Sequence, residues 1–579
     1  MSNGIFKIAA TSPKLAVANV SANCDEIINM LEQAKSENTN IVVFPELCVS
    51  SATCGDLFIN KTLIHACKKG IERICEASKN YKGYVIIGSP VEKDGKLYNC
   101  GLVISEGKII HITTKTNLSL NEKRWFADGE DFKYKSLDEL PFSLIIGEDC
   151  IENISSKLII NISAVGSEVT KYKQLKQYIQ HTGCGYVYAS AGAGESTTDT
   201  VYSGACIIAE NGKILAEGKR YSFSSEITTA EININNCSIS SKSDDLVINS
   251  VTPYDPHPFI PTDKTELSER CEEILEIQST GLAKRMLHTH TSKLVLGISG
   301  GLDSTLALLV AVRTMNKLEY PIEDIVCITM PGFGTTDLTY TNACALVKSV
   351  GATLKEINIK KACLQHFEDI GHHAEIHNVT YENTQARERT QILMDYANMI
   401  GALLVGTGDL SELALGWCTY NGDHMSMYGV NASVPKTLMQ HLVRYVANNS
   451  NKNTAKILYS VLDTPISPEL LPPDKNGKME QKTENTLGPY EVHDYYLYHF
   501  VGRKEKPEEI FDLAQQAFKG IYTKEELKRW LDIFIRRFFI SQFKRSCSPD
   551  GPKVGSVCLS PRGAWSMPSD ACFDEWVNF

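Results

Sequence analysis

The fold of this chain is organised around the stretch Leu294-Val295-Leu296-Gly297-Ile298-Ser299-Gly300-Gly301-Leu302-Asp303-Ser304-Thr305. Residues 294–298 form a short apolar run bounded by glycine, which is typical of a strand buried in a parallel sheet, and residues 305–315 continue as a helix. The small residues between them let the backbone approach a ligand, and the first N–H groups of the helix point at the same place. We therefore expect this turn to bind pyrophosphate.

An aspartate inside the turn indicates a metal ion as well. The Asp303 carboxylate would repel bare phosphate, but it can share a magnesium ion with the phosphates of ATP. The turn lacks the Gly-Lys-Ser/Thr ending of a Walker A motif. Its Ser-Gly-Gly-x-Asp-Ser motif resembles the pyrophosphate loop of the ATP pyrophosphatases, enzymes that release pyrophosphate from ATP while adenylating an oxygen. The alternative is a plain glycine turn between a strand and a helix.

Length and composition describe an ordinary globular protein. The 579 residues are enough for two domains with separate cores, and 22% charged and 43% hydrophobic residues are typical values. A net charge of -11 argues against a nucleic-acid partner. The 18 cysteines contain no Cys-x-x-Cys pair, so we expect free thiols in a reducing cytoplasm. We see no signal peptide and no run of membrane-spanning length.

Short β-rich runs alternate with helical patterns, which predicts an α/β protein. In the first half we expect helices at 23–37 and 61–80, a hairpin at 205–216, and strands at 5–10, 41–44, 84–88, 101–104, 109–113, 142–146, 157–161 and 185–189. In the second half a doubly wound parallel sheet is predicted, with a helix at 266–288 and further strands at 325–329 and 403–406. Four prolines within residues 251–261 suit a linker. We place the domains at 1–245 and 266–579, joined by residues 246–265.

Three predicted strands of the first half end at or beside chemically active side chains. Glu46 ends one strand, Lys115 follows a second, and Gly147-Glu148-Asp149 follows a third. Carboxyl ends of neighbouring strands can converge on one site. The sequence around them resembles the nitrilase superfamily of carbon-nitrogen hydrolases, and this resemblance implies an αββα sandwich. The matching motifs lie at residues 43–47, 115–118, 122–126, 147–149 and, on the substrate side, 194–199.

In that superfamily a glutamate is the general base, a lysine stabilises the tetrahedral intermediate, and a cysteine attacks the amide. The resemblance implies that Glu46 is the base, that Lys115 stabilises the oxyanion, and that Glu122 is an accessory carboxylate. The nucleophile is missing, because family members carry it immediately before the Glu-Asp pair, where this chain has Gly147.

A cysteine does occur nearby, at Cys150, three residues beyond the expected position. On a helix that displacement is about 4.5 Å along the axis, whereas a misplacement of about 1 Å already impairs catalysis. We therefore expect an impaired glutaminase half. Two alternatives stay open: a longer turn recruits Cys150, or Gly147 replaces a native cysteine.

The second half carries further motifs at strand ends and helix starts. They closely resemble the NAD synthetase family over nearly all of residues 270–579, and with the amidase-like first half the chain resembles its two-domain, glutamine-dependent members. Beyond the glycine turn, the motifs lie at residues 329–334, 382–389, 403–412, 414–417, 430–437, 543–545 and 551–554.

This resemblance implies adenylation of the deamido-NAD carboxylate by ATP, followed by attack of ammonia to give NAD, AMP and pyrophosphate. Two polyanions must then be brought together by an acidic chain, which requires local cations and metal. The implied ATP contacts are Gly297, Ile298, Ser299, Gly300, Gly301, Leu302, Asp303, Ser304, Met330 and Thr407. The implied deamido-NAD contacts are Asn383, Arg387, Glu412, Trp417, Tyr420 and Lys544, and the implied Mg2+ ligands are Asp303 and Glu412.

Other functions stay open at this point. Another ATP pyrophosphatase, such as an asparagine or GMP synthetase or a tRNA thiolase, would lack the amidase-like half, and the acidic chain further disfavours tRNA. An amidase with a nucleotide-binding regulator would need the missing nucleophile. The first half can also serve as an interaction module in an oligomer. We expect a homo-oligomer that uses deamido-NAD, ATP and ammonia or glutamine, without nucleic acid or membrane.

Overall fold

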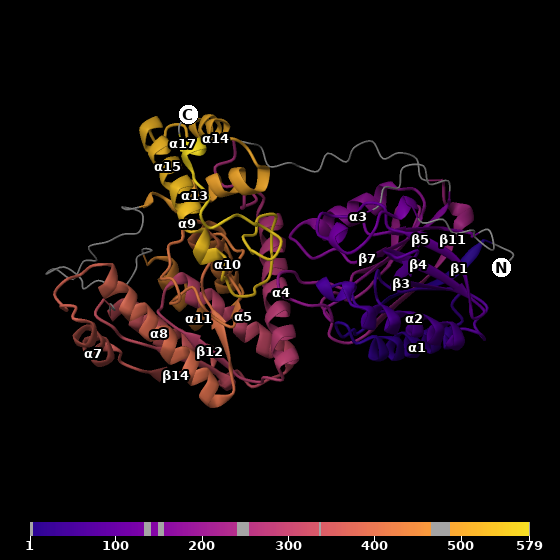
Figure 1. Cartoon of the computed structure of the whole chain (residues 1–579), viewed down its shortest axis with the longest axis horizontal. Coiled ribbons are helices and arrows are strands. Elements are labelled where there is room, and N and C mark those ends of the chain that lie inside the picture. Colours follow the sequence, from indigo (N-terminus) through magenta and orange to yellow (C-terminus); the bar gives the residue numbers. More distant parts are fainter. Residues whose placement is uncertain are drawn as a thin grey trace. The chain divides into compact units, whose positions relative to one another are not determined.

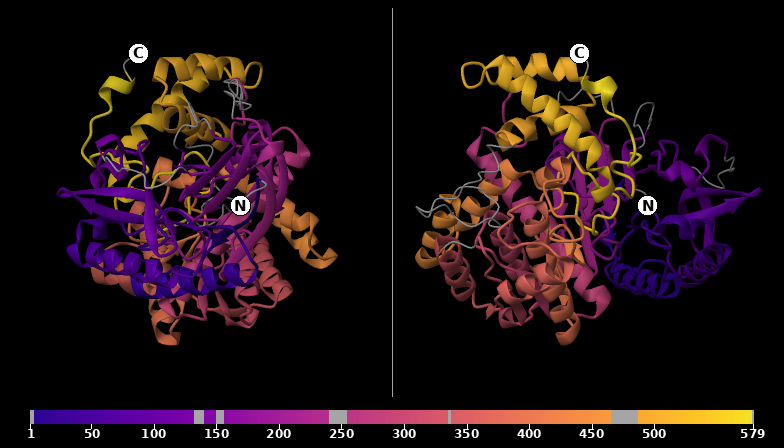
Figure 2. Two further views of the ribbon diagram at one scale, coloured as in Figure 1. Left: turned by 90° about the vertical axis from the view of Figure 1, so that its right-hand side faces the viewer. Right: turned by 60° about the vertical axis from the view of Figure 1, so that its left-hand side comes forward.

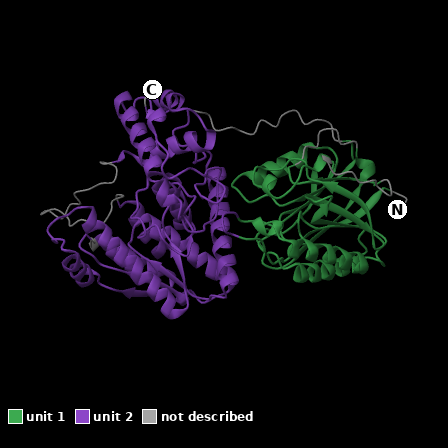
Figure 3. Ribbon diagram, in the orientation of Figure 1, with its two compact units in different colours: residues 1–196, 201–248 green, residues 197–200, 249–579 purple. Residues whose placement is uncertain are grey.

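The protein divides into two compact units, residues 1–196 with 201–248 and residues 197–200 with 249–579 (Figures 1 and 3). The computed structural model describes residues 4–131, 140–148, 156–239, 254–334, 337–464 and 487–577. The short segment 197–200 belongs to the second unit, although its neighbours in sequence belong to the first. The predicted domain boundaries stay a prediction, because residues 240–253 lie outside the described residues.

The described residues of the first unit form two sheets, with strand orders β11-β1-β2-β3-β4-β5 and β10-β9-β8-β7-β6. Its strands are β1 (Ile5–Ser12), β2 (Ile41–Val43), β3 (Tyr84–Lys93), β4 (Lys96–Ser105), β5 (Lys108–Thr114), β6 (Ser143–Ile146), β7 (Leu158–Ser163), β8 (Gly185–Ser190), β9 (Cys206–Glu210), β10 (Lys213–Glu217) and β11 (Glu226–Asn233). Its helices are α1 (Val20–Ser36), α2 (Lys61–Ala77) and α3 (Lys171–His181).

Alternation of side chains along the strands builds a core on each side of both sheets. On β1, Ile8 packs between the two sheets with Leu144, whereas its neighbour Ala9 packs in the cluster that contains Ile27 of α1. On the far side of the second sheet, Ile179 of α3 packs in a third cluster. The order of layers is helix, sheet, sheet, helix, and the predicted αββα sandwich is confirmed.

Local sequence signals predicted most of these elements correctly. The predicted hairpin has its turn at Asn211 and Gly212, whose φ angles are +48° and +76°. Strand β11 was not predicted. It lies at the edge of its sheet, pairs antiparallel with β1, and buries only Thr228 and Ile232. An edge strand with two buried side chains carries little apolar signal, so its pairing with β1 identifies it.

In the described part of the second unit the strands form one sheet of order β14-β13-β12-β15-β16, in which every pairing is parallel, as predicted. Its strands are β12 (Leu294–Gly297), β13 (Ile325–Thr329), β14 (Thr353–Glu356), β15 (Leu403–Gly406) and β16 (Tyr428–Gly429). The helices that contact this sheet or flank it are α4 (Lys264–Thr289), α5 (Leu302–Leu318), α6 (Asp337–Val350), α7 (Lys360–Ile370), α8 (Val379–Ile400), α9 (Leu410–Leu415), α10 (Lys436–Asn448) and α11 (Lys452–Leu462).

Helices α4 and α5 begin earlier than the sequence indicated. Helix α4 begins at Lys264, inside the predicted linker, because the side chain of Asp263 accepts a hydrogen bond from the Glu266 N–H and caps the helix. Helix α5 begins at Leu302 rather than at residue 305, so Asp303 lies in its first turn. The glycine turn is therefore shorter than the sequence indicated.

A cluster of helices near the C-terminus gathers on one side of the second unit (Figures 1 and 2). These helices are α13 (Tyr490–Leu497), α14 (Pro507–Ala517), α15 (Lys524–Ile540), α16 (Gln542–Arg545) and α17 (Asp574–Val577). Leu410 and Leu415 of α9 pack in the same core as Tyr495 and Phe534, and this packing sets the orientation of α9. Among the helices of the described part, none combines the length and apolar character that crossing a bilayer requires.

Candidate active sites

The first candidate site lies at three strand ends of the first unit. Glu46 comes shortly after β2, Lys115 directly after β5, and Gly147 directly after β6. Lys115 Nζ lies 2.9 Å from Glu46 Oε1 and 2.7 Å from Glu122 Oε1. The structure therefore brings together the strand ends that the sequence suggested would converge.

Burial controls the charges of this cluster. Glu46 is 1% exposed, and its carboxylate accepts hydrogen bonds from Asn99 at 2.7 Å and from the Ala164 N–H at 2.8 Å. Burial raises the pKa of Glu46, which makes it a stronger base. For Lys115 burial acts in the opposite direction, but Glu46 and Glu122 outweigh it and raise the pKa, so Lys115 stays protonated. Burial also opposes the charge of Glu122, yet Lys115 lowers the pKa of that carboxyl.

Gly147 occupies the centre of this arrangement without a side chain. Its φ angle is +64°, and a Cβ added there would lie 3.0 Å from Lys115 Nζ and 3.4 Å from Glu46 Oε2. Its N–H donates to the Ile162 carbonyl at 2.7 Å, which holds the turn against β7. A side chain at position 147 would thus point at both charged groups, and the glycine at this position supplies no nucleophilic atom of its own. Cys150 lies outside the described residues.

The predicted substrate-side motif at 194–199 divides between the two units. In the first unit the carboxylate of Glu195 is buried and accepts the backbone N–H groups of Ala52 and Thr53 at 2.8 and 3.0 Å. Asp199 belongs to the second unit, where it pairs with Arg562 at 2.9 Å. Only the first part of the motif therefore remains with the amidase-like unit.

The second candidate site begins at the glycine turn between β12 and α5. Gly300 has φ +88°, and a Cβ there would lie 2.0 Å from the carbonyl oxygen of Thr339, so only glycine fits. Gly301 is the N-cap of α5 and has no side chain to cover the first N–H groups of the helix. Those groups and the hydroxyls of Ser299 and Ser304, which lie 3.2 Å apart, suit an anion.

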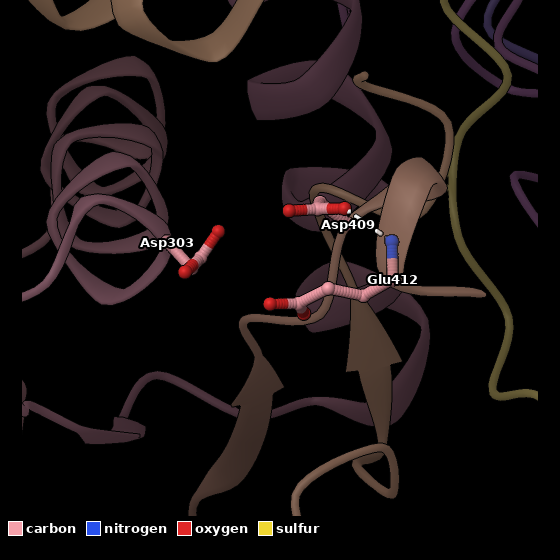
Figure 4. Close-up of side chains that lie close together, drawn as sticks. All are labelled: Asp303, Asp409 and Glu412. Atoms are coloured by element: carbon pink, nitrogen blue, oxygen red, sulfur yellow. Dashed lines mark hydrogen bonds between the residues drawn. The ribbon is translucent and has the colours of Figure 1, made fainter. Parts of the chain in front are cut away.

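Three carboxylates meet beside this turn, as Figure 4 shows. They belong to Asp303 on α5, to Asp409 at the N-cap of α9 and to Glu412 within α9, and one oxygen from each lies within 4.8 Å of the others. Lys436 Nζ, at the start of α10, lies 2.6 Å from Asp303 Oδ1, 2.5 Å from Asp409 Oδ2 and 3.0 Å from Glu412 Oε1. The sequence pointed to Asp303 and Glu412, but it missed Asp409 and Lys436.

Buried charge in this cluster exceeds what the lysine neutralises. Burial, and then the neighbouring carboxylates, raise the pKa of Glu412 to about 7 and that of Asp409 above its usual range. Burial opposes the charge of Lys436, but the three carboxylates outweigh it and raise its pKa. Asp409 Oδ2 is buried, and its partner is the Lys436 ammonium at 2.5 Å. Three carboxylates around a single ammonium leave oxygens in excess, which fit a hard cation such as Mg2+.

The predicted dinucleotide residues gather around residues 416–420, after α9. Lys544 Nζ donates to the carbonyls of Gly416 and Cys418 at 2.7 and 2.6 Å, and Arg387 Nε donates to the Tyr420 carbonyl at 3.3 Å. Asn383 reaches the same loop through a 2.8 Å hydrogen bond that its side-chain oxygen accepts from the Thr419 hydroxyl. Tyr420 is 43% exposed, whereas the guanidinium of Arg537 lies over the ring of Trp417 at 5.0 Å.

The two remaining predicted ATP contacts lie at the carboxyl ends of strands. Met330 follows β13, is buried, and packs in the core that α7 and α8 share with the sheet. Thr407 follows β15, and the side-chain amide of Asn431 donates to its carbonyl and to that of Asp303, both at 3.1 Å. Asn431 thereby ties the end of β15 to the first turn of α5.

Comparison with known proteins identifies the class of each unit. Residues 7–238 match the carbon-nitrogen hydrolase family, and residues 274–531 match the NAD synthase family. The protein is thus an enzyme that joins an amidase-type unit to a synthase-type unit.

Relatives that match the whole chain identify its family more narrowly. A "Glutamine-dependent NAD(+) synthetase" of Mycobacterium leprae is 33% identical over all of this chain and 98% of that protein, and one of Mycobacterium tuberculosis is 31% identical with the same coverage. The chain belongs to the family of glutamine-dependent NAD(+) synthetases, which are ligases. The resemblance predicted from the motifs is therefore confirmed.

Solved structures share this fold. A crystal structure of a glutamine-dependent NAD(+) synthetase from Cytophaga hutchinsonii has a TM-score of 0.80 at 20% identity, over 99% of both chains. One from Acinetobacter baumannii, in complex with ADP, has a TM-score of 0.68 at 22% identity, over 96% of this chain and 97% of that one.

Proposed function

We propose that the second unit adenylates the carboxylate of deamido-NAD with ATP and then amidates it with ammonia, releasing AMP and pyrophosphate. The carrying observation is the carboxylate cluster of Asp303, Asp409 and Glu412 beside the glycine turn. Both lie at the carboxyl ends of parallel strands, where α/β proteins bind ligands. The curated names of the relatives support the reaction, and the ADP in the Acinetobacter structure supports a nucleotide ligand.

Each part of the site has a role in this proposal. The N–H groups at the start of α5 hold the pyrophosphate portion of ATP, which Gly300 allows to approach the backbone. Residues 416–420, held by Lys544, Arg387 and Asn383, carry deamido-NAD, and the 43% exposed Tyr420 adds an aromatic side chain to this loop. No side chain acts as a nucleophile, since alignment of the carboxylate with the α-phosphate and neutralisation of charge suffice.

Magnesium belongs to the same proposal. Asp303, Asp409 and Glu412 would hold the ion, and when bound it neutralises charge on the phosphates. Lys436 keeps these carboxylates together through its ammonium group, which contacts all three. In this proposal Glu412 is a metal ligand. Its role toward deamido-NAD is limited to holding the start of the loop at residues 416–420, where its carbonyl accepts the Trp417 N–H.

We further propose that the first unit hydrolyses glutamine poorly or not at all. Amide hydrolysis in the carbon-nitrogen hydrolases passes through a thioester, and Gly147 has no atom with which to form one. Glu46 and Lys115 keep a base and an oxyanion-stabilising charge at the site, but neither replaces the nucleophile. Ammonia from solution then supplies the second unit. The competing function is full glutamine dependence through Cys150.

One assay tests both proposals. Purified protein receives ATP, magnesium and deamido-NAD with either ammonium or glutamine, and NAD and AMP are quantified. We expect NAD and AMP in equal amounts with ammonium, increasing with pH as more ammonia is uncharged, and little NAD with glutamine. No NAD from ammonium would refute the synthetase proposal for this chain. Robust glutamine-dependent synthesis that Cys150→Ala abolishes would refute the loss of glutaminase activity.

A further inference from the structure

A cysteine and a histidine meet beside the proposed dinucleotide loop, and neither has a role in the proposed reaction. Cys547 follows α16 and is exposed, and its Sγ lies 3.6 Å from Nε2 of His424. The same sulfur lies 3.3 Å from the carbonyl oxygen of Lys544. Of these two neighbours, only the imidazole can take up the thiol proton.

His424 is held rigidly with this nitrogen facing the sulfur. The residue is 6% exposed, and its ring stacks on Tyr420 with centroids 5.5 Å apart. Its Nδ1 lies 3.1 Å from the carbonyl of Thr419 and 3.1 Å from the N–H of Asn421. When Nδ1 donates to the Thr419 carbonyl, Nε2 is free to accept the thiol proton, and when Nδ1 accepts from the Asn421 N–H, Nε2 donates to the sulfur. Either tautomer joins Nε2 to Cys547 Sγ, and the first makes His424 a base for the thiol.

Burial lowers the pKa of His424, so that the imidazole is a neutral base near neutral pH. A thiol beside such a base is the arrangement found in reactive cysteines, whereas a thiol surrounded by apolar groups is inert. Cys572 provides the contrast, because it is also exposed but no histidine contact joins it among the described residues. Cys547 and His424 thus form a pair of an exposed thiol and a neighbouring base.

We propose that Cys547 and His424 form a reactive thiol site, and that a small organic disulfide caps Cys547 and blocks the adjacent dinucleotide loop. The Cys547 sulfur attacks one sulfur of the disulfide, a new S–S bond forms, and the original S–S bond breaks. The leaving thiolate takes the proton that His424 received, so one thiol and one disulfide yield one mixed disulfide and one thiol. The incoming disulfide is the oxidant.

The cap would disturb the loop through direct neighbours. Cys547 lies next to Lys544, which holds residues 416 and 418, and Tyr420 lies between His424 and Phe543 with ring centroids 5.5 and 5.2 Å away. A group added to the sulfur has to share this space with His424 and Tyr420. The inhibition rests on the proposed function, because it assumes that residues 416–420 carry deamido-NAD.

The reactivity is tested on the intact protein with bis(2-hydroxyethyl) disulfide, an uncharged probe, by mass spectrometry of the peptides that contain Cys547 and Cys572. We expect Cys547 to form the mixed disulfide about tenfold faster than Cys572, because His424 Nε2 lies within reach of the Cys547 thiol proton. His424→Gln should bring the two rates together. Equal rates in the unaltered protein would overturn the proposal, and this comparison holds even if His424→Gln does not fold.

The consequence is tested by ammonium-dependent NAD formation during the same labelling. Activity should fall in parallel with capping of Cys547 and return with dithiothreitol. Cys547→Ser should keep the untreated activity and resist the disulfide, and Cys572→Ser should stay sensitive. Full activity after complete capping of Cys547 would overturn the blocking role. Lack of activity in untreated protein would instead count against the proposed function, while the labelling rates would still test the thiol site.

Discussion

Both units place a lysine among carboxylates near strand ends, but the two clusters differ in the number of carboxylates and in the residue that lies beside them. In the first unit Lys115 lies between Glu46 and Glu122, and the adjacent position, Gly147, offers no reactive atom. In the second unit Lys436 lies among three carboxylates, so the carboxylates outnumber the ammonium, and the magnesium proposal rests on this excess. Similar ion clusters can therefore serve different chemistry, and the groups beside each cluster decide what the site can do.

The largest expected effect concerns the nucleophile. Loss of the nucleophile costs about a millionfold in turnover in another hydrolase, so glutamine should support almost no NAD formation here. Gly147→Cys should raise glutamine hydrolysis by several orders of magnitude, because its side chain would start 3.0 Å from Lys115 Nζ and 3.4 Å from Glu46 Oε2. Glutamate release is the measurement.

The φ angle of +64° at position 147 makes a non-glycine residue cost about 1–2 kcal/mol of stability. Urea unfolding of Gly147→Cys checks that cost, and Gly147→Ser is the matched control for strain without a thiol. If Gly147→Cys folds and still releases no glutamate, the first unit has lost more than its nucleophile. Cys150→Ala should change nothing.

The second effect concerns the metal cluster. Asp303→Ala and Glu412→Ala should each lower NAD formation about 100- to 1,000-fold, the usual cost of removing a group that stabilises developing charge. Titration with magnesium and its removal by EDTA are the readouts. Glu368→Ala, on an exposed position of α7, is the control. Near-normal turnover of either variant at saturating ATP and magnesium would remove that residue from the metal site.

A third prediction concerns how the stability of the second unit depends on pH. His493 of α13 is buried, and burial lowers its pKa to about 4. A histidine with a folded pKa below its unfolded value of about 6.5 stabilises the fold above pH 6.5, and this stability is lost as the pH falls toward 4. At pH 5 the loss is about 2 kcal/mol.

Urea unfolding at pH 7 and pH 5, followed by tryptophan fluorescence, measures this loss mainly in the second unit, because only Trp125 of the five tryptophans lies in the first. His493→Gln should lose about 2 kcal/mol less than the unaltered protein between these pH values. An identical loss in both proteins would contradict the assignment of this pH dependence to His493.

The smallest effect concerns the dinucleotide loop. Lys544→Ala removes the ammonium that donates to the carbonyls of Gly416 and Cys418, so the loop loses two charge-assisted hydrogen bonds. The apparent KM for deamido-NAD should rise about tenfold or more, and that for ATP should change much less. Steady-state kinetics with each substrate varied in turn measures both. Equal increases would move Lys544 to the ATP side.

The sequence alone predicted much of each site, because strands and glycine turns leave local signals. The run from Leu294 into Gly300 predicted a glycine turn between a strand and a helix, which the structure contains, and Glu46 and Lys115 were recognisable at strand ends. Asp409 was not, because it caps α9 by accepting the Glu412 N–H at 2.8 Å, and its residue type suits any helix cap. An aspartate that only caps a helix and one that also joins a carboxylate cluster look the same in sequence.

By itself the sequence determined the α/β class, the parallel sheet with its glycine turn, the family, and the glycine at position 147, since each depends on residue type and short spacing. Only the tertiary structure decided that Lys436, 133 residues beyond Asp303, enters the carboxylate cluster, and that His424 faces Cys547. It also decided that position 147 points at Lys115 and Glu46. The physical reason is that charge, burial and reactivity depend on distances in space, which the packing of helices on sheets sets and which no local pattern records.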